Sequence, residues 1–190
     1  MFTAVKKLSN VLCLVALCIT LSVPAMAKDK VSKDFPVSYK GDSRLAEEVA
    51  HAIRMYPWYD IFDWVEGTVH NGVVTLTGEV REPFHKDDYG KMVARIPGVK
   101  RINNELRVLP LSRFDDQIRW AAANTIYRDP MFTAYAIQAN PPIHIIVENG
   151  KVTLTGVVRN PMEKQIAETK VRTSVMAFDV TNDLKVEERG

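Results

Sequence analysis

The sequence predicts an α+β fold made of two tandem modules, and a repeated segment is the main observation behind this prediction. Residues 71–83, NGVVTLTGEVREP, return as residues 149–161, NGKVTLTGVVRNP, with ten of thirteen positions identical and a constant offset in numbering (149 − 71 = 78). A stretch of helical periodicity precedes each copy, and a second helical stretch and a closing strand follow it. In such a duplication, features of both copies belong to the fold, whereas features of one copy mark divergence.

Residues 1–27 are typical of a secretory signal peptide. Lys6 and Lys7 give a basic start, residues 11–23 are mostly apolar, and residues 25–27 (AMA) have the small residues of a cleavage site. We therefore expect export to the periplasm, cleavage after Ala27 and a soluble mature chain. The alternative is an uncleaved anchor, although the apolar run is short for a membrane span.

Cysteine and charge usage narrow the possible functions. Both cysteines, Cys13 and Cys18, fall in the signal segment, so the mature chain has no disulfide and no cysteine metal site. Removing Lys6 and Lys7 lowers Lys plus Arg from 25 to 23 (25 − 2), which equals the 23 Asp plus Glu. Proteins that bind nucleic acid through phosphates carry a basic excess, so we exclude nucleic acid as a partner.

The mature chain begins with a leader and continues as two modules. Residues 28–40 mix charged and small residues without a sustained period, which predicts a flexible leader. Module 1 is expected at residues 41–109 and module 2 at residues 110–188.

Each module is expected to open with an amphipathic helix. Apolar residues recur at helical spacing over residues 45–56, and Asp42 or Ser43 is placed to cap the start. In the second copy Ser112 is the cap and Phe114 begins the matching stripe.

A β-hairpin follows in each copy. Strands are expected at residues 63–70 and 143–148, each leading into Asn-Gly and a second strand. Asn-Gly favours a type I′ turn, because both central residues of that turn need positive φ. Gly78 and Gly156 lie inside the second strands, where a glycine indicates a bulge or close packing of a helix on the sheet.

A helix and a last strand complete each module. Pro83 and Pro161 stand where a helix can begin, since the first turn does not need the missing N–H. The last strands, at residues 99–109 and 178–186, arrive by a crossover and can pair in parallel. Each module therefore reads helix, strand, strand, helix, strand, with two helices covering one face of a three-stranded mixed sheet.

The copies differ in length before the hairpin. The separation in numbering between the cap and the Asn-Gly turn is 71 − 43 = 28 in module 1 and 149 − 112 = 37 in module 2. The nine extra residues fall within the proline-containing stretch 127–142, which predicts a longer loop or an extra helical turn.

The repeated hairpin and closing strand follow one pattern in both copies. Its members are Val74, Leu76, Gly78, Val80, Gly98, Val99, Ile102, Asn104, Leu106 and Val108 in module 1, and Val152, Leu154, Gly156, Val158, Val180, Asn182, Leu184 and Val186 in module 2. With this pattern the chain resembles the BON family, named for bacterial osmotically inducible Y and nodulation proteins, over residues 41–188. Module 2 departs from the pattern where Met176 and Ala177 replace Gly98 and Val99.

The resemblance implies a periplasmic, non-enzymatic dual-BON protein. Its modules would bind phospholipid or support envelope integrity during osmotic or envelope stress, as in transport-associated proteins of this kind. The resemblance brings no catalytic residues.

The residues themselves give no sign of catalysis or metal binding. The nearest cluster, His85 with Asp87 and Asp88, has no counterpart in the other copy, and a helix dipole explains the two aspartates. Nucleophile elbows, phosphate loops and zinc signatures are absent from the sequence. We therefore expect no enzyme activity, no cofactor, no metal and no small-molecule substrate.

Two features could bind a partner. Residues 56–64, YPWYDIFDW, contain five aromatics, and exposed Trp and Tyr favour membrane interfaces or protein hot spots. The alternative is that they cap the core, which we favour for Phe62 and Trp64 and leave open for Trp58 and Tyr59. The second feature is a set of cations on and after the second helix of each module, for which a solvated helix face is the alternative.

The leading hypothesis is a periplasmic two-module protein that docks on phospholipid surfaces or envelope proteins. Its predicted binding residues are aromatic or basic: Trp58, Tyr59, Lys91, Arg95, Lys100, Arg101, Phe132, Lys170 and Arg172. The main alternative is a soluble periplasmic chaperone or interaction adaptor that holds polypeptide clients through the aromatic loops.

Overall fold

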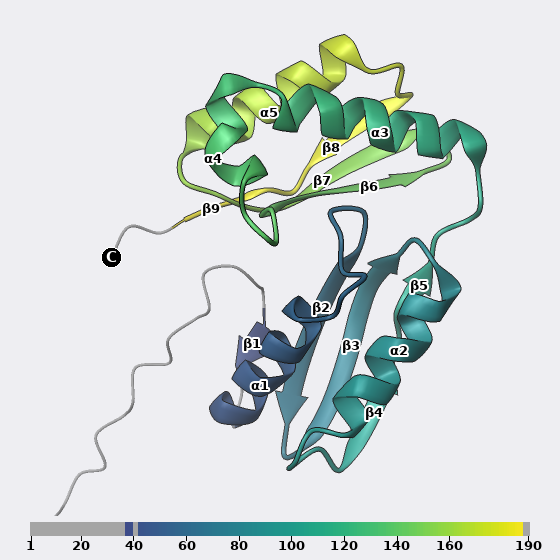
Figure 1. The fold of residues 1–190 in the computed structure, drawn as a ribbon, viewed down its shortest axis with the longest axis vertical. Helices are drawn as coiled ribbons and strands as arrows, with labels where there is room; N and C mark the ends of the chain where they lie inside the picture. The colour runs from purple at the N-terminus through teal and green to yellow at the C-terminus, as the bar shows by residue number, and fades with distance from the viewer. Residues whose placement is uncertain (1–36, 40–41, 188–190) are drawn as a thin grey trace, which may run out of the picture.

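The computed structural model describes residues 37–39 and 42–187, which form two α+β modules, one stacked on the other (Figure 1). The predicted signal peptide and residues 28–36 of the predicted leader lie outside the described residues. The leader prediction is wrong for residues 37–39, because strand β1 (Val37–Tyr39) pairs in parallel with the first hairpin strand of module 1.

Module 1 contains two helices and one mixed sheet. Its remaining elements are α1 (Ser43–Arg54), β2 (Trp64–His70), β3 (Val73–Val80), α2 (Pro83–Ala94), β4 (Arg101–Asn104) and β5 (Arg107–Val108). The strand order is β1-β2-β3-β4, and β5 also pairs with β3. Both helices lie on the same face of the sheet (Figure 1).

Module 2 repeats this plan with an insertion. Its elements are α3 (Arg113–Tyr127), the 3₁₀ turn η1 (Pro130–Phe132), α4 (Thr133–Ala136), β6 (Ile143–Glu148), β7 (Lys151–Val158), α5 (Pro161–Ser174), β8 (Asp179–Asn182) and β9 (Lys185–Val186). The extra residues before the second hairpin form η1 and α4, which agrees with the predicted extra helical turn.

The Asn-Gly turns have the predicted backbone. The φ angles are 52° at Asn71 and 79° at Gly72, and 52° at Asn149 and 74° at Gly150. Two successive positive φ angles are the signature of a type I′ turn, whose twist matches that of the flanking strands.

The closing strand is interrupted in both modules, and an asparagine causes the interruption. The Asn104 side chain accepts a hydrogen bond from the backbone N–H of Leu106 (3.3 Å) and donates one to the carbonyl of Lys86 in α2 (2.8 Å). Asn182 forms the equivalent bonds in module 2. The asparagine thereby ties the strand to the second helix, and the leucine two residues later turns into the core.

Gly78 and Gly156 are required by the neighbouring strand rather than by a helix. A Cβ on Gly78 would lie 2.1 Å from the Trp64 carbonyl oxygen, and one on Gly156 would lie 1.9 Å from that of Pro142. Their φ angles, 117° and 116°, are also strained for any residue with a side chain. Both explanations predicted from the sequence, a bulge and helix packing, are wrong: the pairing runs through Gly78 and Gly156 without an extra residue, and the nearest atoms belong to the backbone of the neighbouring strand.

The outer edge of each sheet is closed in a different way. In module 1, β1 covers the edge of β2 from Gly67 to Val69. In module 2 the equivalent edge of β6 is closed by groups from other elements: the hydroxyl of Tyr127 bonds Ile143, the carbonyl of Ile61 accepts from the N–H of Ile145 (2.7 Å), and the guanidinium of Arg119 donates to the carbonyl of Val147 (2.6 Å). Both closures remove free strand edges, which otherwise promote aggregation.

The loop between α1 and β2 joins the two modules. Phe62 is 2 % exposed and belongs to the core of module 2, where it meets the Trp120 ring edge-on at 5.0 Å between centroids. The carboxylate of Asp60 accepts from the backbone N–H of Phe62 (2.8 Å) and thereby shapes the loop. The sequence placed Phe62 in a core, and the structure assigns it to the core of the other module.

Other residues of module 1 cover part of the face of the second sheet that carries no helices. Trp64 and Leu109 of module 1 pack with Ile146 of β6 in a small buried cluster. Arg107 adds ion pairs to Glu79 (3.2 Å) and, across the junction, to Glu148 (2.5 Å). The two modules therefore pack together through both apolar and charged contacts.

A glycine-to-alanine change tests the strained strand position. Gly156→Ala should lower the free energy of unfolding by at least about 2 kcal/mol, because positive φ and the Pro142 carbonyl both oppose a Cβ. Gly67→Ala is the matched control, since its Cβ would meet only side chains at 3.6 Å or beyond and should change stability by less than about 1 kcal/mol. Urea unfolding of both variants measures this, and equal losses would contradict the explanation.

Removal of the inserted ring tests the junction. Phe62→Ala should destabilise the protein by about 3 kcal/mol, as expected for loss of a buried phenylalanine, and most of the loss should fall on module 2. Trp58→Ala in the same loop is the control, because Trp58 is 63 % exposed. Hydrogen exchange resolved by residue measures both effects, and unchanged protection in β6 and α3 would contradict them.

Candidate functional site

A basic groove between α2 and β4 brings together three of the predicted binding residues. Lys91 of α2 and Lys100 and Arg101 at the start of β4 line a hollow of about 430 Å³. Its other walls are small or apolar and belong to Gly90, Ala94, Val99 and Ile102. The three cations meet because the short turn at residues 95–100 places the start of β4 beside the helix that precedes it.

The cations of this groove have no acidic partner within the described part of the chain. Lys91, Lys100, Arg101 and the neighbouring Arg95 are all exposed and take part in no ion pair between described residues. Their positive charge is therefore available to a ligand.

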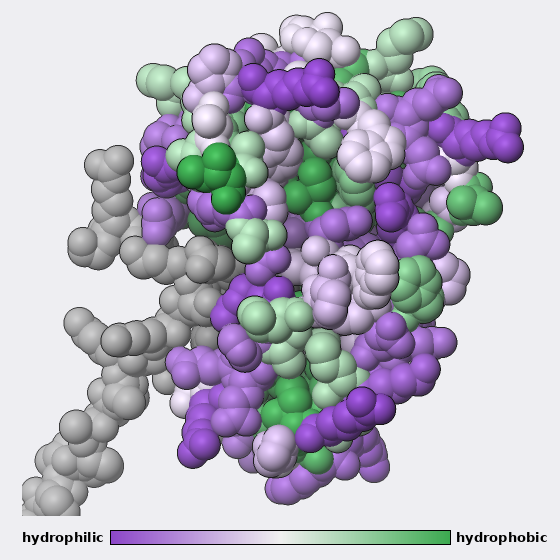
Figure 2. All heavy atoms as spheres, in the orientation of Figure 1, coloured by the Kyte–Doolittle hydropathy of each residue, from purple (hydrophilic) through white to green (hydrophobic). Residues whose placement is uncertain are grey.

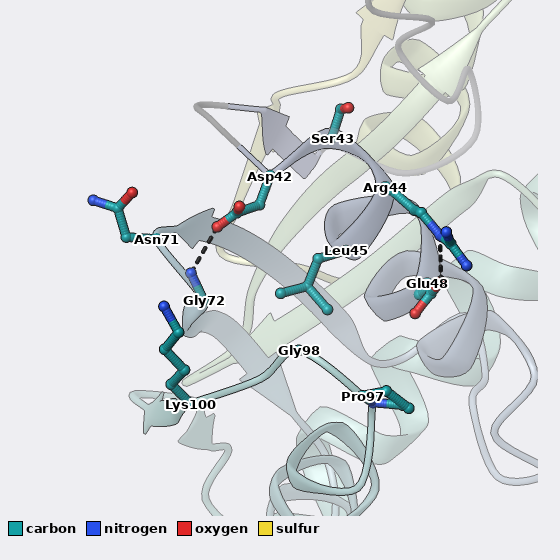
Figure 3. Close-up of a pocket in the computed structure, with 10 residues that line it drawn as sticks. All are labelled: Asp42, Ser43, Arg44, Leu45, Glu48, Asn71, Gly72, Pro97, Gly98 and Lys100. Atoms are coloured by element: carbon teal, nitrogen blue, oxygen red, sulfur yellow. Dashed lines mark hydrogen bonds and ion pairs between the residues drawn. The ribbon is translucent and has the colours of Figure 1, made fainter.

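Lys100 also borders a second hollow of about 770 Å³ at the start of α1 (Figure 3). The polar groups there are already engaged: the Asp42 carboxylate accepts from the N–H of Gly72 (2.6 Å), and Arg44 pairs with Glu48 (3.1 Å). In Figure 3 the Lys100 side chain extends along the turn at Gly72, away from the Arg44–Glu48 pair. This hollow therefore adds little free charge to the basic groove.

Module 2 has no equivalent basic groove. At the constant offset between the copies (149 − 71 = 78), the four cations of module 1 are replaced by Thr169, Thr173, Phe178 and Asp179.

The predicted residues Lys170 and Arg172 are held by neighbours within module 2. Lys170 is paired with Asp129, which lowers the pKa of that aspartate. Arg172 is paired with Glu168 (3.1 Å) and donates to the carbonyl of Val180 (2.6 Å). The structure therefore does not bring them into a common site with the cations of module 1.

The predicted aromatic residues fall into three environments. Trp58 is 63 % exposed, and Tyr59 is half-buried against Tyr89 and His144, with ring centroids 6.4 and 5.4 Å away. Phe132 is fully buried and stacks with Tyr135 in the core of module 2. The prediction that Phe132 contacts a partner is corrected, because the η1 turn directs its ring inward.

An apolar tip at the turn end of module 2 was missed from the sequence. Phe114, Met176 and Phe178 are 44, 88 and 76 % exposed, and the two phenylalanine rings lie 5.6 Å apart. Both rings cover the Gly150 turn, since a Cβ there would lie within 3.1 Å of each.

Comparison of the two copies could have found this tip. The equivalent positions in module 1 are Leu45, Gly98 and Lys100, because the offset is 112 − 43 = 69 at the capping serines and 149 − 71 = 78 later in the chain. The same end of the module is therefore partly basic in one copy and apolar in the other.

The visible face of the molecule is mainly hydrophilic. In Figure 2 hydrophilic atoms cover the outer side of α2, and hydrophobic atoms show in the hollow between α1 and α2. The helices between Ser43 and Ser174 include none that is long and apolar enough to cross a bilayer.

The buried polar groups of module 1 are structural. The Asp63 carboxylate accepts from the His85 ring (2.6 Å), from the Tyr89 hydroxyl (3.4 Å) and from the N–H of Arg81 (2.8 Å). In module 2 the N–H of Arg159 donates to the Tyr135 hydroxyl and to the Glu163 carboxylate. Across residues 37–39 and 42–187, no cluster of His, Cys, Asp and Glu has the composition of a metal site.

Comparison with known proteins identifies a family for the chain. The sequence profile of the BON domain matches residues 41–110 and 134–188. Two solved structures of CdsD, a structural protein of the type III secretion system of Chlamydia trachomatis, are similar. One has 15 % identity, a TM-score of 0.30, and coverage of 76 % of this chain and 94 % of that one. The other, its C-terminal domain, has 14 % identity, a TM-score of 0.27, and coverage of 75 % and 96 %. No curated protein sequence matches.

Proposed function

The chain belongs to the BON domain family, whose members are in general non-catalytic binding proteins of the periplasm or membrane, and we propose that it binds anionic phospholipid surfaces of the envelope. The basic groove of module 1 is the proposed headgroup site, with Lys91, Lys100 and Arg101 as its cations and Arg95 as a neighbouring cation. Periplasmic location, a signal peptide cleaved after Ala27, and a role in envelope or osmotic stress are parts of the same proposal.

The single observation that carries the proposal is the cluster of four cations without ion-pair partners among the described residues. Arg107, Lys170 and Arg172 are instead paired with carboxylates, so their charges are less available to a ligand. A cation held near an anionic bilayer contributes about 1 kcal/mol, so four contribute about 4 kcal/mol. That corresponds to a dissociation constant of roughly 1 mM, which is weak and sensitive to salt.

The apolar tip of module 2 offers a second contact. Exposed phenylalanine and methionine side chains gain roughly 1.5 to 3 kcal/mol each when fully buried, so partial insertion of Phe114, Met176 and Phe178 would add a contribution of the same order as the electrostatic one. A second contact raises the apparent affinity strongly when both surfaces reach one membrane.

Vesicle flotation tests the proposal. The protein should float at low salt with vesicles containing phosphatidylglycerol, and it should be released by about 0.5 M salt, where the Debye length falls to a few ångström. Lys91→Gln with Arg101→Gln should reduce the bound fraction several-fold on this basis.

The matched control removes the same charge elsewhere. Arg128 and Lys185 are exposed residues of module 2 outside the groove, so Arg128→Gln with Lys185→Gln should leave flotation nearly unchanged. An equal loss in both variants would assign binding to net charge, and absence of flotation in the unmodified protein would overturn the lipid proposal.

A chaperone or adaptor that holds polypeptides is the second candidate. It is favoured by the exposure of Met55, Trp58 and Phe84, which are 65, 63 and 47 % exposed. On this alternative the protein suppresses aggregation of an unfolded client without lipid, Trp58→Ala weakens the suppression, and Lys91→Gln does not.

A further inference from the structure

His144 lies at the module junction in a position that the other copy fills differently. It is 5 % exposed, on the open face of the second sheet that module 1 covers. The equivalent residue in module 1 is Glu66 (144 − 78 = 66), which is half-buried and lines the hollow between the two sheets together with Ile146 and Thr155. The junction therefore has a buried imidazole on the second sheet, where the equivalent position of the first sheet has a partly exposed carboxylate.

Aromatic rings enclose the imidazole, and its burial outweighs the nearby backbone of Asp60 and Asp63 and the Asp63 charge, which favour the charged form. The rings of Tyr59 and Trp64 lie 5.4 and 5.2 Å from it, between centroids, and Nε2 is 3.4 Å from the Tyr59 hydroxyl. The other nitrogen, Nδ1, is buried without a hydrogen-bond partner in the described structure. On β7, the residue paired with His144 is the uncharged Thr155.

The charged groups that face His144 come from the loop of module 1 and have other partners. Asp63 accepts from the His85 ring and from the N–H of Arg81. Asp60 accepts from the N–H of Phe62 and lies 3.8 Å from Arg81. Neither carboxylate forms an ion pair with His144, and burial lowers the pKa of the imidazole from 6.5 to about 4.

The surface next to His144 is apolar and is covered only while the modules are in contact. Trp64 and Leu109 on one side meet Ile146, two residues beyond His144, on the other. Arg107 joins Glu79 to Glu148 across the same junction. The aliphatic residues of the two cores lie in separate clusters, and Phe62 is the residue of module 1 that enters the core of module 2.

We propose that the junction is an acid-sensitive hinge, in which protonation of His144 separates the two facing sheets and uncovers the apolar surface of Trp64, Leu109 and Ile146, while Phe62 stays in the core of module 2 and both modules stay folded. The inference does not depend on lipid binding.

The direction of the pH dependence follows from the lowered pKa. The closed junction binds the neutral imidazole, so its stabilisation is complete above pH 6.5 and declines as the pH falls toward 4. Burial also raises the pKa of Asp60, so loss of its charge acts on the same loop during acidification.

A pH titration of the purified protein tests the hinge. Between pH 6.5 and 4 the radius of gyration from small-angle scattering should rise and the Trp64 emission should shift to longer wavelength in a Trp58→Phe, Trp120→Phe background. Far-UV circular dichroism should stay constant over the same range. His144→Gln should move this transition below pH 4, whereas His51→Gln, on an exposed position of α1, should leave it in place.

Three outcomes would overturn the proposal. The first is the same transition in the His144→Gln variant, and the second is loss of the dichroism signal together with expansion, since that is unfolding of the modules. If the His144→Gln variant fails to fold, the pKa of His144 can be measured in the unmodified protein by nuclear magnetic resonance titration. A pKa at or above 6.5 for this imidazole is the third contradicting outcome, and a pKa near 4 supports the hinge.

Discussion

The insertion of Phe62 into the core of the neighbouring module is the contact on which the rest of the structure depends. A module of about 75 residues has little stability to spare, because total folding free energies are about 5 to 15 kcal/mol and small domains bury a smaller share of their surface. Loss of one buried phenylalanine costs about 3 to 5 kcal/mol. Module 2 is therefore stable as observed only with the loop of module 1 in place, and the relative position of the two modules follows from this requirement.

The two copies differ in how the outer edge of the sheet is closed. Among the described residues β6 has no counterpart of β1 along its outer edge, and its outward backbone groups instead bond Tyr127, Ile61 and Arg119. A buried arginine is costly unless its charge is paired, and Arg119 is paired with Asp116 (2.6 Å). Its Nε remains without a partner in the described structure, so the closure of this edge is tolerated rather than optimal.

Local sequence signals predicted the elements because each depends on neighbours in the chain. The Asn-Gly turns, the proline-started helices and the hairpin strands follow from backbone preferences that act over a few residues. The closing strands were expected to be continuous, and they are broken because Asn104 and Asn182 bond a helix that lies 18 residues earlier.

The site was predicted only where its parts are close in sequence. Lys91, Lys100 and Arg101 meet because α2 and β4 are consecutive. Lys170 was expected in a comparable patch, but its charge is held by Asp129, far away in the chain, and periodicity does not reveal such a partner. Phe132 was expected at the surface for the same reason, since the inward direction of η1 depends on tertiary packing. β1 was missed because three residues are too few to show a strand period, although Val37 and Tyr39 favour strands.

The central claim is that the loop of module 1 makes the two modules one rigid body at neutral pH. Backbone ¹⁵N relaxation tests it most directly, because rotational correlation times are obtained separately for the amides of each module. The structure predicts a single correlation time for both, appropriate to a particle of the size of the whole chain. Two different and shorter correlation times, one for each module, would contradict the claim.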